Sequence, residues 1–196
     1  MILSLTRRAV LRTASVLALS SVCRVAAAAH DGPGLVKPPL SVPDMDVVLH
    51  TGRKTTLRDL LTGRATALQL MFTGCSATCP IQGALFAQVQ DHLPKEKLPL
   101  QLVSFSIDPL GDNAQAMQAW LAKFGAHDPW LGAIPGAFTV DAWLDVLNGR
   151  AAGPDRHTGQ VFFFNHHGML NLRTVDFPNP EEVARLLVTL ASQVKG

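Results

Sequence analysis

Apolar runs and helically spaced apolar residues alternate along the chain from about residue 46 onward. The run from Ala67 to Phe72 has the length and flanks of a buried strand. The apolar residues after it recur at helical spacing: Ile81, Ala84, Leu85, Val89 and Leu93. Pro80 can begin this helix, because the first helical position needs no main-chain donor. The pattern predicts a strand followed by a helix at the centre of the domain.

The same reasoning predicts the remaining elements, in chain order. They are a hairpin of 46–49 and 55–57, a short helix over 57–61, a strand over 100–107, a helix from Asp112 or Asn113 to Phe124, a loop over 130–136, a helix from Thr139 to Leu147, a hairpin of 161–164 and 169–172, and a last helix from Pro180. The glycine- and proline-rich segment 30–45 is expected to be a flexible leader. This order is that of a thioredoxin-like domain, so we predict an α/β three-layer fold with a central mixed sheet over 46–194.

Residues 1–29 have the pattern of an export signal, with a basic start, a short apolar middle and small residues at the end. The pair Arg7-Arg8 resembles a twin-arginine signal. The apolar stretch is short for a membrane span and Arg24 interrupts it, although an uncleaved anchor remains the alternative. We therefore expect an exported, periplasmic protein that loses Cys23 with its signal.

The charge of the chain changes when the signal is removed. The full sequence has 17 basic and 15 acidic side chains and a formal net charge of +2. Because residues 1–29 contain four arginines and no acid, the remainder carries 13 basic and 15 acidic side chains, a net charge of −2. The apparent basicity therefore belongs to the signal, which argues against a nucleic-acid partner.

Two cysteines, Cys75 and Cys79, fall in the predicted turn between the central strand and its helix. If the turn is wound like a helix, residues four apart share a face and the sulfurs can approach each other. The positive end of the helix dipole favours a thiolate, which is a nucleophile and a soft metal ligand. The alternative is two buried structural cysteines or a static disulfide. The spacing therefore predicts a redox-active pair or a metal site without choosing between them.

The chain has seven histidines that are candidates for a third donor. Six fall in the leader, in turns or near helix ends. His157 instead follows the irregular Gly153-Pro-Asp-Arg loop and directly precedes a predicted strand. Sequence position alone leaves open whether His157 is a ligand or an ordinary loop histidine.

The motifs together resemble the Sco/SenC family of exported copper chaperones, which assemble the binuclear copper centre of cytochrome oxidase. They are Phe72-Thr73-x-Cys75-x-x-x-Cys79-Pro80, Ser106-Ile107-Asp108-Pro109 with Asp112 after it, Lys123-Phe124-Gly125, His157-Thr158 and Asp176-Phe-Pro-Asn-Pro180. The resemblance implies a copper site of Cys75, Cys79 and His157, which suits Cu(I), with Cu(II) as the other oxidation state. It also implies three partners: the copper-site subunit of cytochrome c oxidase, a periplasmic copper donor and a thiol reductant. We expect a monomer.

The sequence departs from the family at the histidine. The family often has Asp directly before it, whereas Arg156 stands there and Asp155 is one residue further away; the loop that carries the histidine also looks short. A thiol-disulfide oxidoreductase that reduces cysteines of a client copper protein is therefore the alternative function. A plain interaction module, in which both cysteines are dispensable, is the third.

Zinc is the competing metal, but structural zinc prefers four protein donors and we identify three.

Overall fold

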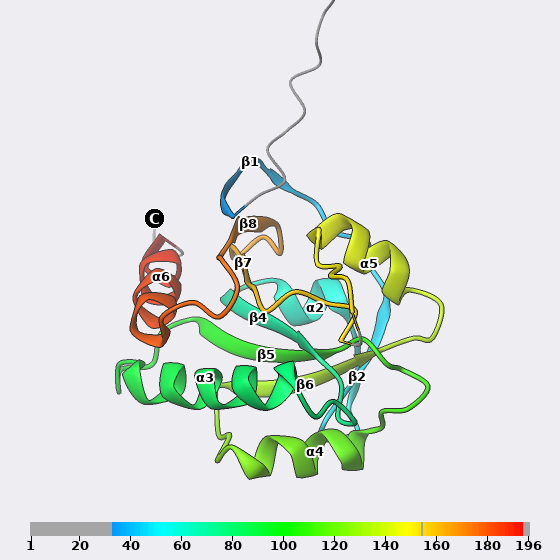
Figure 1. Cartoon of the computed structure of the whole chain (residues 1–196). Coiled ribbons are helices and arrows are strands. Elements are labelled where there is room, and N and C mark those ends of the chain that lie inside the picture. The colour runs from blue at the N-terminus through cyan, green and yellow to red at the C-terminus, as the bar shows by residue number, and fades with distance from the viewer. Residues whose placement is uncertain (1–32, 154, 194–196) are drawn as a thin grey trace, which may run out of the picture. The chain divides into compact units, whose positions relative to one another are not determined.

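Eight strands form one mixed sheet in the order β1-β8-β7-β4-β5-β6-β2-β3 in the computed structural model (Figure 1). The structure describes residues 33–153 and 155–193, so the predicted export signal lies outside the described residues. The strands are β1 Gly34–Leu40, β2 Asp46–Leu49, β3 Lys54–Thr56, β4 Ala65–Met71, β5 Leu100–Ser106, β6 Trp130–Pro135, β7 Val161–Phe164 and β8 Leu170–Arg173. The helices are α2 Leu57–Leu61, α3 Thr78–His92, α4 Ala114–Lys123, α5 Val140–Leu147 and α6 Pro180–Ser192.

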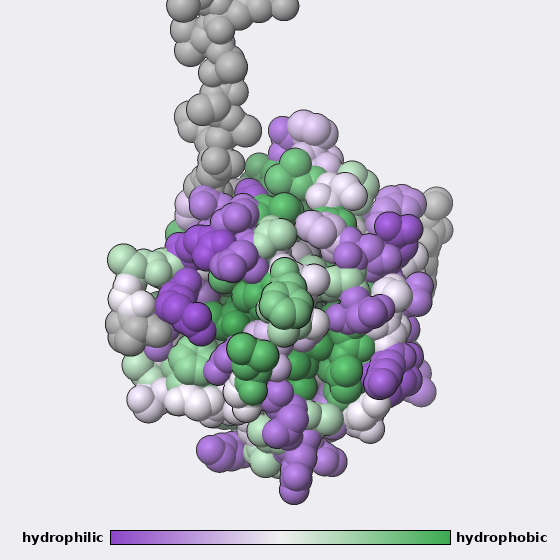
Figure 2. Space-filling model, turned by 90° about the vertical axis from the view of Figure 1, so that its right-hand side faces the viewer, coloured by the Kyte–Doolittle hydropathy of each residue, from purple (hydrophilic) through white to green (hydrophobic). Residues whose placement is uncertain are grey.

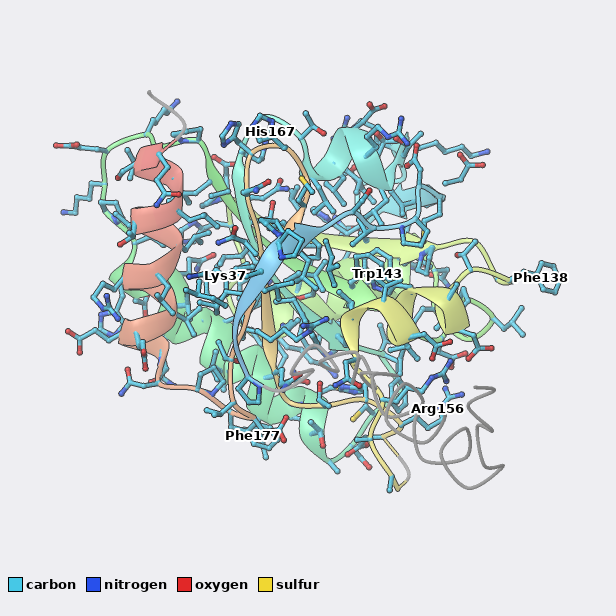
Figure 3. All side chains as sticks on the ribbon, turned by 90° about the horizontal axis from the view of Figure 1, so that it is seen from above. Lys37, Phe138, Trp143, Arg156, His167 and Phe177 are labelled. Carbon is cyan, nitrogen blue, oxygen red and sulfur yellow. The ribbon has the colours of Figure 1, made fainter. Side chains whose placement is uncertain are left out.

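Helices cover both faces of the sheet, which confirms the predicted three-layer α/β fold (Figure 1). Helices α3, α4 and α6 pack on one face, in a core that includes Phe86, Trp120 and Leu187. Helices α2 and α5 pack on the other face, where Trp143 points from α5 into the core and stacks on Phe164 (Figure 3). No helix within the described ranges is long and apolar enough to cross a membrane.

The centre of the sheet is parallel and positions the loops that matter here. Strand β4 pairs in parallel with β5, and β5 with β6, whereas β7 pairs antiparallel to β4. The carboxyl ends of β4 and β5 therefore lie at the same edge of the sheet as the start of β7. Ligand sites in open α/β sheets form at this edge. The cysteine turn after β4 and the loop before β7 meet there.

Two predictions about strands are wrong. The segment 130–136 was expected to be a loop, but Trp130–Pro135 is strand β6, inside the sheet between β5 and β2. The segment 30–45 was expected to be flexible, but Gly34–Leu40 is strand β1, paired antiparallel with β8. Since β1 joins the sheet, the ordered domain begins before the predicted boundary at residue 46.

Candidate metal and redox centre

The cysteine turn joins the end of β4 to the start of α3. The main-chain N–H of Cys75 donates to the carbonyl of Phe72 at 3.1 Å, which closes the turn. Helix α3 begins at Thr78, two residues before the predicted start at Pro80. Cys75 therefore lies in the turn, and Cys79 is the second residue of the helix. The two residues meet there, because the main-chain N–H of Cys79 donates to Cys75 Sγ at 3.2 Å.

The two thiols are free and have different environments. Cys75 is partly exposed, whereas Cys79 is fully buried in the core between the sheet and α3. Burial raises the pKa of the Cys79 thiol well above its ordinary value, and the hydrogen bond with Cys75 raises it further. Cys79 therefore stays protonated at neutral pH unless a metal ion displaces its proton.

This difference predicts unequal alkylation of the metal-free, reduced protein. At neutral pH we expect iodoacetamide to modify Cys75 about tenfold faster than Cys79 or more, since each unit of raised pKa lowers the thiolate fraction tenfold. The rates are measured by mass spectrometry of the two cysteine-bearing peptides over time. In urea, where burial is lost, the two rates should become similar; faster modification of Cys79 in the folded protein would contradict the assignment.

His157 lies beside Cys79, with Nε2 at 3.6 Å from Cys79 Sγ. Its other ring nitrogen, Nδ1, is 2.9 Å from the carbonyl oxygen of Thr158. Since a carbonyl only accepts, Nδ1 carries the proton and Nε2 presents its lone pair toward the sulfur. Burial lowers the pKa of His157, which keeps the ring neutral and able to bind a metal ion. The ring also contacts Phe72 edge to face, with centroids 6.3 Å apart.

Asp155 is a further acidic group at the centre. Its Oδ1 is 3.4 Å from Cys75 Sγ, so the thiol donates to the carboxylate. The hydroxyl of Thr78 also donates to Asp155, and this bond is the main cause that lowers the pKa of the carboxyl group. The family pattern pointed to the residue directly before the histidine, which is Arg156. The structure instead brings the carboxylate of Asp155 to the cysteine turn.

Asp112, in the loop between β5 and α4, supports the cysteine turn, a role that sequence reasoning missed. Its carboxylate accepts from the main-chain N–H of Thr73 at 3.0 Å and from the hydroxyl of Ser106 at 2.6 Å, and the Thr73 hydroxyl donates to it as well. It thus ties the chain two residues before Cys75 to the neighbouring strand. The Ser-Ile-Asp-Pro motif with Asp112 after it was the available signal, but we used it only for the family resemblance and considered Asp112 only as one of two possible helix caps. Of the two predicted cap residues, Asp112 and Asn113, it is Asn113 that caps α4.

The other described histidines lie in different settings. His50 accepts from the main-chain N–H of Gly132, His127 bonds the carbonyl of Asp128, and His166 and His167 contact each other in the β7–β8 turn. His92 is exposed at the end of α3. His30 lies outside the described residues.

The predicted ligands are close together but are not arranged around one point. Within residues 33–153 and 155–193, no three His, Cys, Asp or Glu side chains form a ready-made metal site. Sulfur and nitrogen donors on one small ion, with bonds of about 2.3 and 2.0 Å, lie roughly 3.5 to 4 Å apart. The Cys79–His157 distance of 3.6 Å already meets this condition. Closing a three-donor site therefore requires a side-chain movement, for which the partly exposed Cys75 is the freest donor.

Comparisons with known proteins agree with this architecture. The sequence profile of the SCO1/SenC family matches residues 37–132. The SCO1 protein homolog of Bacillus subtilis (strain 168) is 28% identical over 80 residues, which span 40% of this chain and 41% of that protein.

Two solved structures share the fold. BsSco, described as a member of the Sco family of cytochrome c oxidase assembly proteins with a disulfide switch, has a TM-score of 0.67 at 18% identity, covering 79% of this chain and 95% of that chain. Bradyrhizobium japonicum ScoI, solved with copper bound, has a TM-score of 0.62 at 19% identity, covering 76% and 99%. At these identities the likeness concerns the fold alone.

The fold and the centre define a thioredoxin-like α/β protein with two neighbouring thiols and a histidine at the carboxyl edge of its sheet. The family profile, the Bacillus subtilis homolog and the Sco structures together support assignment to the SCO1/SenC family.

Proposed function

We propose that this protein is an exported copper chaperone that carries Cu(I) on Cys75, Cys79 and His157 and delivers it during assembly of a cytochrome c oxidase copper centre. The observation that carries the proposal is the approach of His157 Nε2 to Cys79 Sγ at 3.6 Å, with the lone pair of the nitrogen directed at the site. The copper bound to Bradyrhizobium japonicum ScoI and the oxidase-assembly role of the family of BsSco support it.

The donor set suits Cu(I) as cargo. Thiolates are soft ligands that select Cu(I), and a neutral imidazole completes a site of low coordination number. Binding replaces the proton of each thiol by the metal ion and releases both protons. Asp155 accepts a hydrogen bond from Cys75 and is the nearest base to receive the first of them. Zinc fits less well, because structural zinc sites use four protein donors.

The first residues and the surface support the following setting in the cell. The export signal of residues 1–29 directs the protein to the periplasm, where it meets a copper donor, a thiol reductant and the copper-site subunit of the oxidase. Loops at the carboxyl edge of the sheet expose large hydrophobic side chains: Leu110 after β5, and Phe138 after β6, which points away from the protein (Figure 3). The molecular face in Figure 2 shows hydrophobic residues gathered among hydrophilic ones. A contiguous hydrophobic patch, unlike a single exposed side chain, is typical of a surface that contacts another protein.

Replacement of His157 tests the proposal. We expect His157→Ala to lower the affinity for Cu(I) on the order of 100-fold, because loss of a ligand costs at least as much as loss of a group that supports one. The affinity is measured under nitrogen by competition with a chromophoric Cu(I) chelator. His92→Ala, at the exposed end of α3, is the matched control and should bind like the wild type. An unchanged affinity in a folded His157→Ala protein would exclude the imidazole as a ligand.

A thiol-disulfide oxidoreductase is the second candidate. The unequal burial of Cys75 and Cys79 favours it, because the accessible thiol can attack a client disulfide while the buried thiol waits to resolve the mixed disulfide. The rate at which the reduced, copper-free protein reduces a disulfide client separates the two functions. Negligible exchange near neutral pH favours copper delivery alone, whereas rapid exchange that survives His157→Ala favours the oxidoreductase.

A further inference from the structure

The loop before β7 is a short hairpin that sets the main-chain position of His157. Arg150 and His157 pair as an isolated antiparallel bridge. The N–H of Thr158 donates to the carbonyl of Gly149 at 2.8 Å, and the N–H of Ala151 donates to that of Arg156 at 3.1 Å. Because His157 Nδ1 is bonded to the carbonyl of the next residue, the orientation of the ring follows this hairpin. A shift of the 149–151 segment therefore displaces Nε2 relative to Cys79.

The side chain of Arg150 fastens that segment to α5. Its Nε contacts Asp145 Oδ1 at 2.6 Å, and its Nη2 lies 3.0 Å from both Asp141 Oδ1 and the Asp141 carbonyl. The hydrogen bond from Arg150 lowers the pKa of Asp145, as expected for a charged pair. One guanidinium thus holds three acceptors on one helix. A planar fork of donors suits this arrangement better than a lysine ammonium would.

The carboxyl end of helix α5, where the hairpin begins, is itself held in place by hydrogen bonds. The buried Arg173 of β8 donates to the carbonyls of Leu147 and Val146 at 2.7 and 3.0 Å, at the carboxyl end of the helix. Gly149 then passes so close to the sheet that a Cβ would lie 2.8 Å from Leu70 Cδ1. The first strand of the hairpin is therefore anchored at both its main chain and its Arg150 side chain.

The backbone conformation of the second strand of the hairpin, residues 156–158, depends on its pairing with the first strand, residues 149–151. Arg156 has a left-handed backbone with φ of 59°, a conformation that non-glycine residues seldom adopt without support. The pairing with residues 149–151 supplies that support directly before His157.

We propose that Arg150 is a positioning residue for the copper site, which holds the hairpin on α5 so that His157 Nε2 stays within reach of Cys79 Sγ. The guanidinium does not touch the metal ion. It acts only through the backbone pairing with His157, and so differs from the ligands. This inference rests on the proposed copper function, but its first consequence concerns the protein without metal.

The test uses Arg150→Ala in the full mature protein. In the metal-free protein, amide hydrogen exchange at Thr158 and Ala151 should become about three- to fivefold faster, the size expected for loss of an exposed ion-pair network. The Cu(I) affinity should fall by about the same factor. In a His157→Ala background, Arg150→Ala should cause no further loss of affinity. Arg185→Ala, which removes an exposed ion pair with Glu182 on α6, is the matched control.

A second variant keeps the test independent of how Arg150→Ala folds. Asp141→Asn with Asp145→Asn removes the acceptor charges and should have the same effects. In 1 M salt the difference between this variant and the wild type should become smaller, because screening already weakens the ion pairs of the wild type. Unchanged exchange at Thr158 in both variants overturns the inference. An equal loss of affinity with and without His157 also overturns it, since Arg150 would then act elsewhere. Absence of Cu(I) binding by the wild type would instead refute the proposed function, while the exchange measurement still decides the role of Arg150.

Discussion

Replacing both cysteines by serine should abolish tight Cu(I) binding. Serine keeps nearly the same size, but its hydroxyl does not ionise at neutral pH and is a hard ligand, so the soft ion loses two of three donors. We expect Cys75→Ser with Cys79→Ser to weaken binding by about three orders of magnitude or more, which equals roughly 4 kcal/mol of binding free energy. Chelator competition under nitrogen measures the loss.

The matched control for this double variant is Ser76→Ala, an exposed residue in the same turn that contributes no donor to the proposed site. It should bind copper like the wild type. Circular dichroism and thermal unfolding show whether the double variant remains folded, because Cys79 lies in the core. Full-strength binding by the folded double variant would refute the proposed site. Oxidase activity in cells with limiting copper then tests the third possibility, a module in which the cysteines are dispensable.

The elements that the sequence predicts well are those whose burial pattern is uniform. Strands β4 and β5 are buried along their whole length, and their apolar runs identify them directly. Strand β6 was missed because Gly132 and Pro135 interrupt a short run. Gly132 is there because α4 packs directly on the sheet, so that a Cβ would lie 2.3 Å from Met117 Cγ. Strand β1 was missed because it contains Pro38 and Pro39, which are tolerated only because β1 is an edge strand.

The sequence predicted that helix α3 exists, but not which of its sides is buried. The helically spaced apolar residues that predicted it include Ile81 and Ala84, and such a stripe usually faces the core. The structure exposes Ile81 and Ala84 and buries Gln82 and Gln90. Gln90 is bonded to the carbonyl of Gly125 and to the N–H of His127, so tertiary hydrogen bonds account for its burial. No such partner exists for the Gln82 amide among the described residues, and the structure does not explain its burial.

The sequence likewise predicted some parts of the candidate centre and not others. The spacing of Cys75 and Cys79 is local, so the sequence alone suggested that the two sulfurs approach each other. His157 is 78 residues from Cys79; its loop setting distinguished it from the other histidines, but only the family resemblance made it a ligand. The contribution of Arg150 was invisible, because it depends on how α5 lies against the hairpin. Contacts of this kind are set by packing between distant elements, which no local pattern encodes.

Oxidation of the cysteine pair should remove the site and bound Cu(I) should prevent that oxidation. A disulfide between Cys75 and Cys79 forms with loss of two protons and two electrons to dioxygen, and leaves no thiolate for the metal ion. Only His157 and the carboxylate of Asp155 then remain, a set that suits weak Cu(II) binding better than Cu(I). We expect the oxidised protein to bind Cu(I) about three orders of magnitude more weakly than the reduced protein, or not measurably. An oxidising compartment would therefore make a dedicated thiol reductant necessary.

The protection is measured by exposing metal-free and Cu(I)-loaded protein to air and alkylating the remaining thiols after denaturation. The metal-free sample should lose both thiols together, since each sulfur is the other's partner, whereas the loaded sample should retain both. Each single variant, Cys75→Ser or Cys79→Ser, is the control, because a lone thiol has no second cysteine among the described residues to pair with and should survive longer than the pair. Equal loss of thiols in the metal-free and loaded wild-type samples would show that copper and the disulfide do not compete for the same sulfurs.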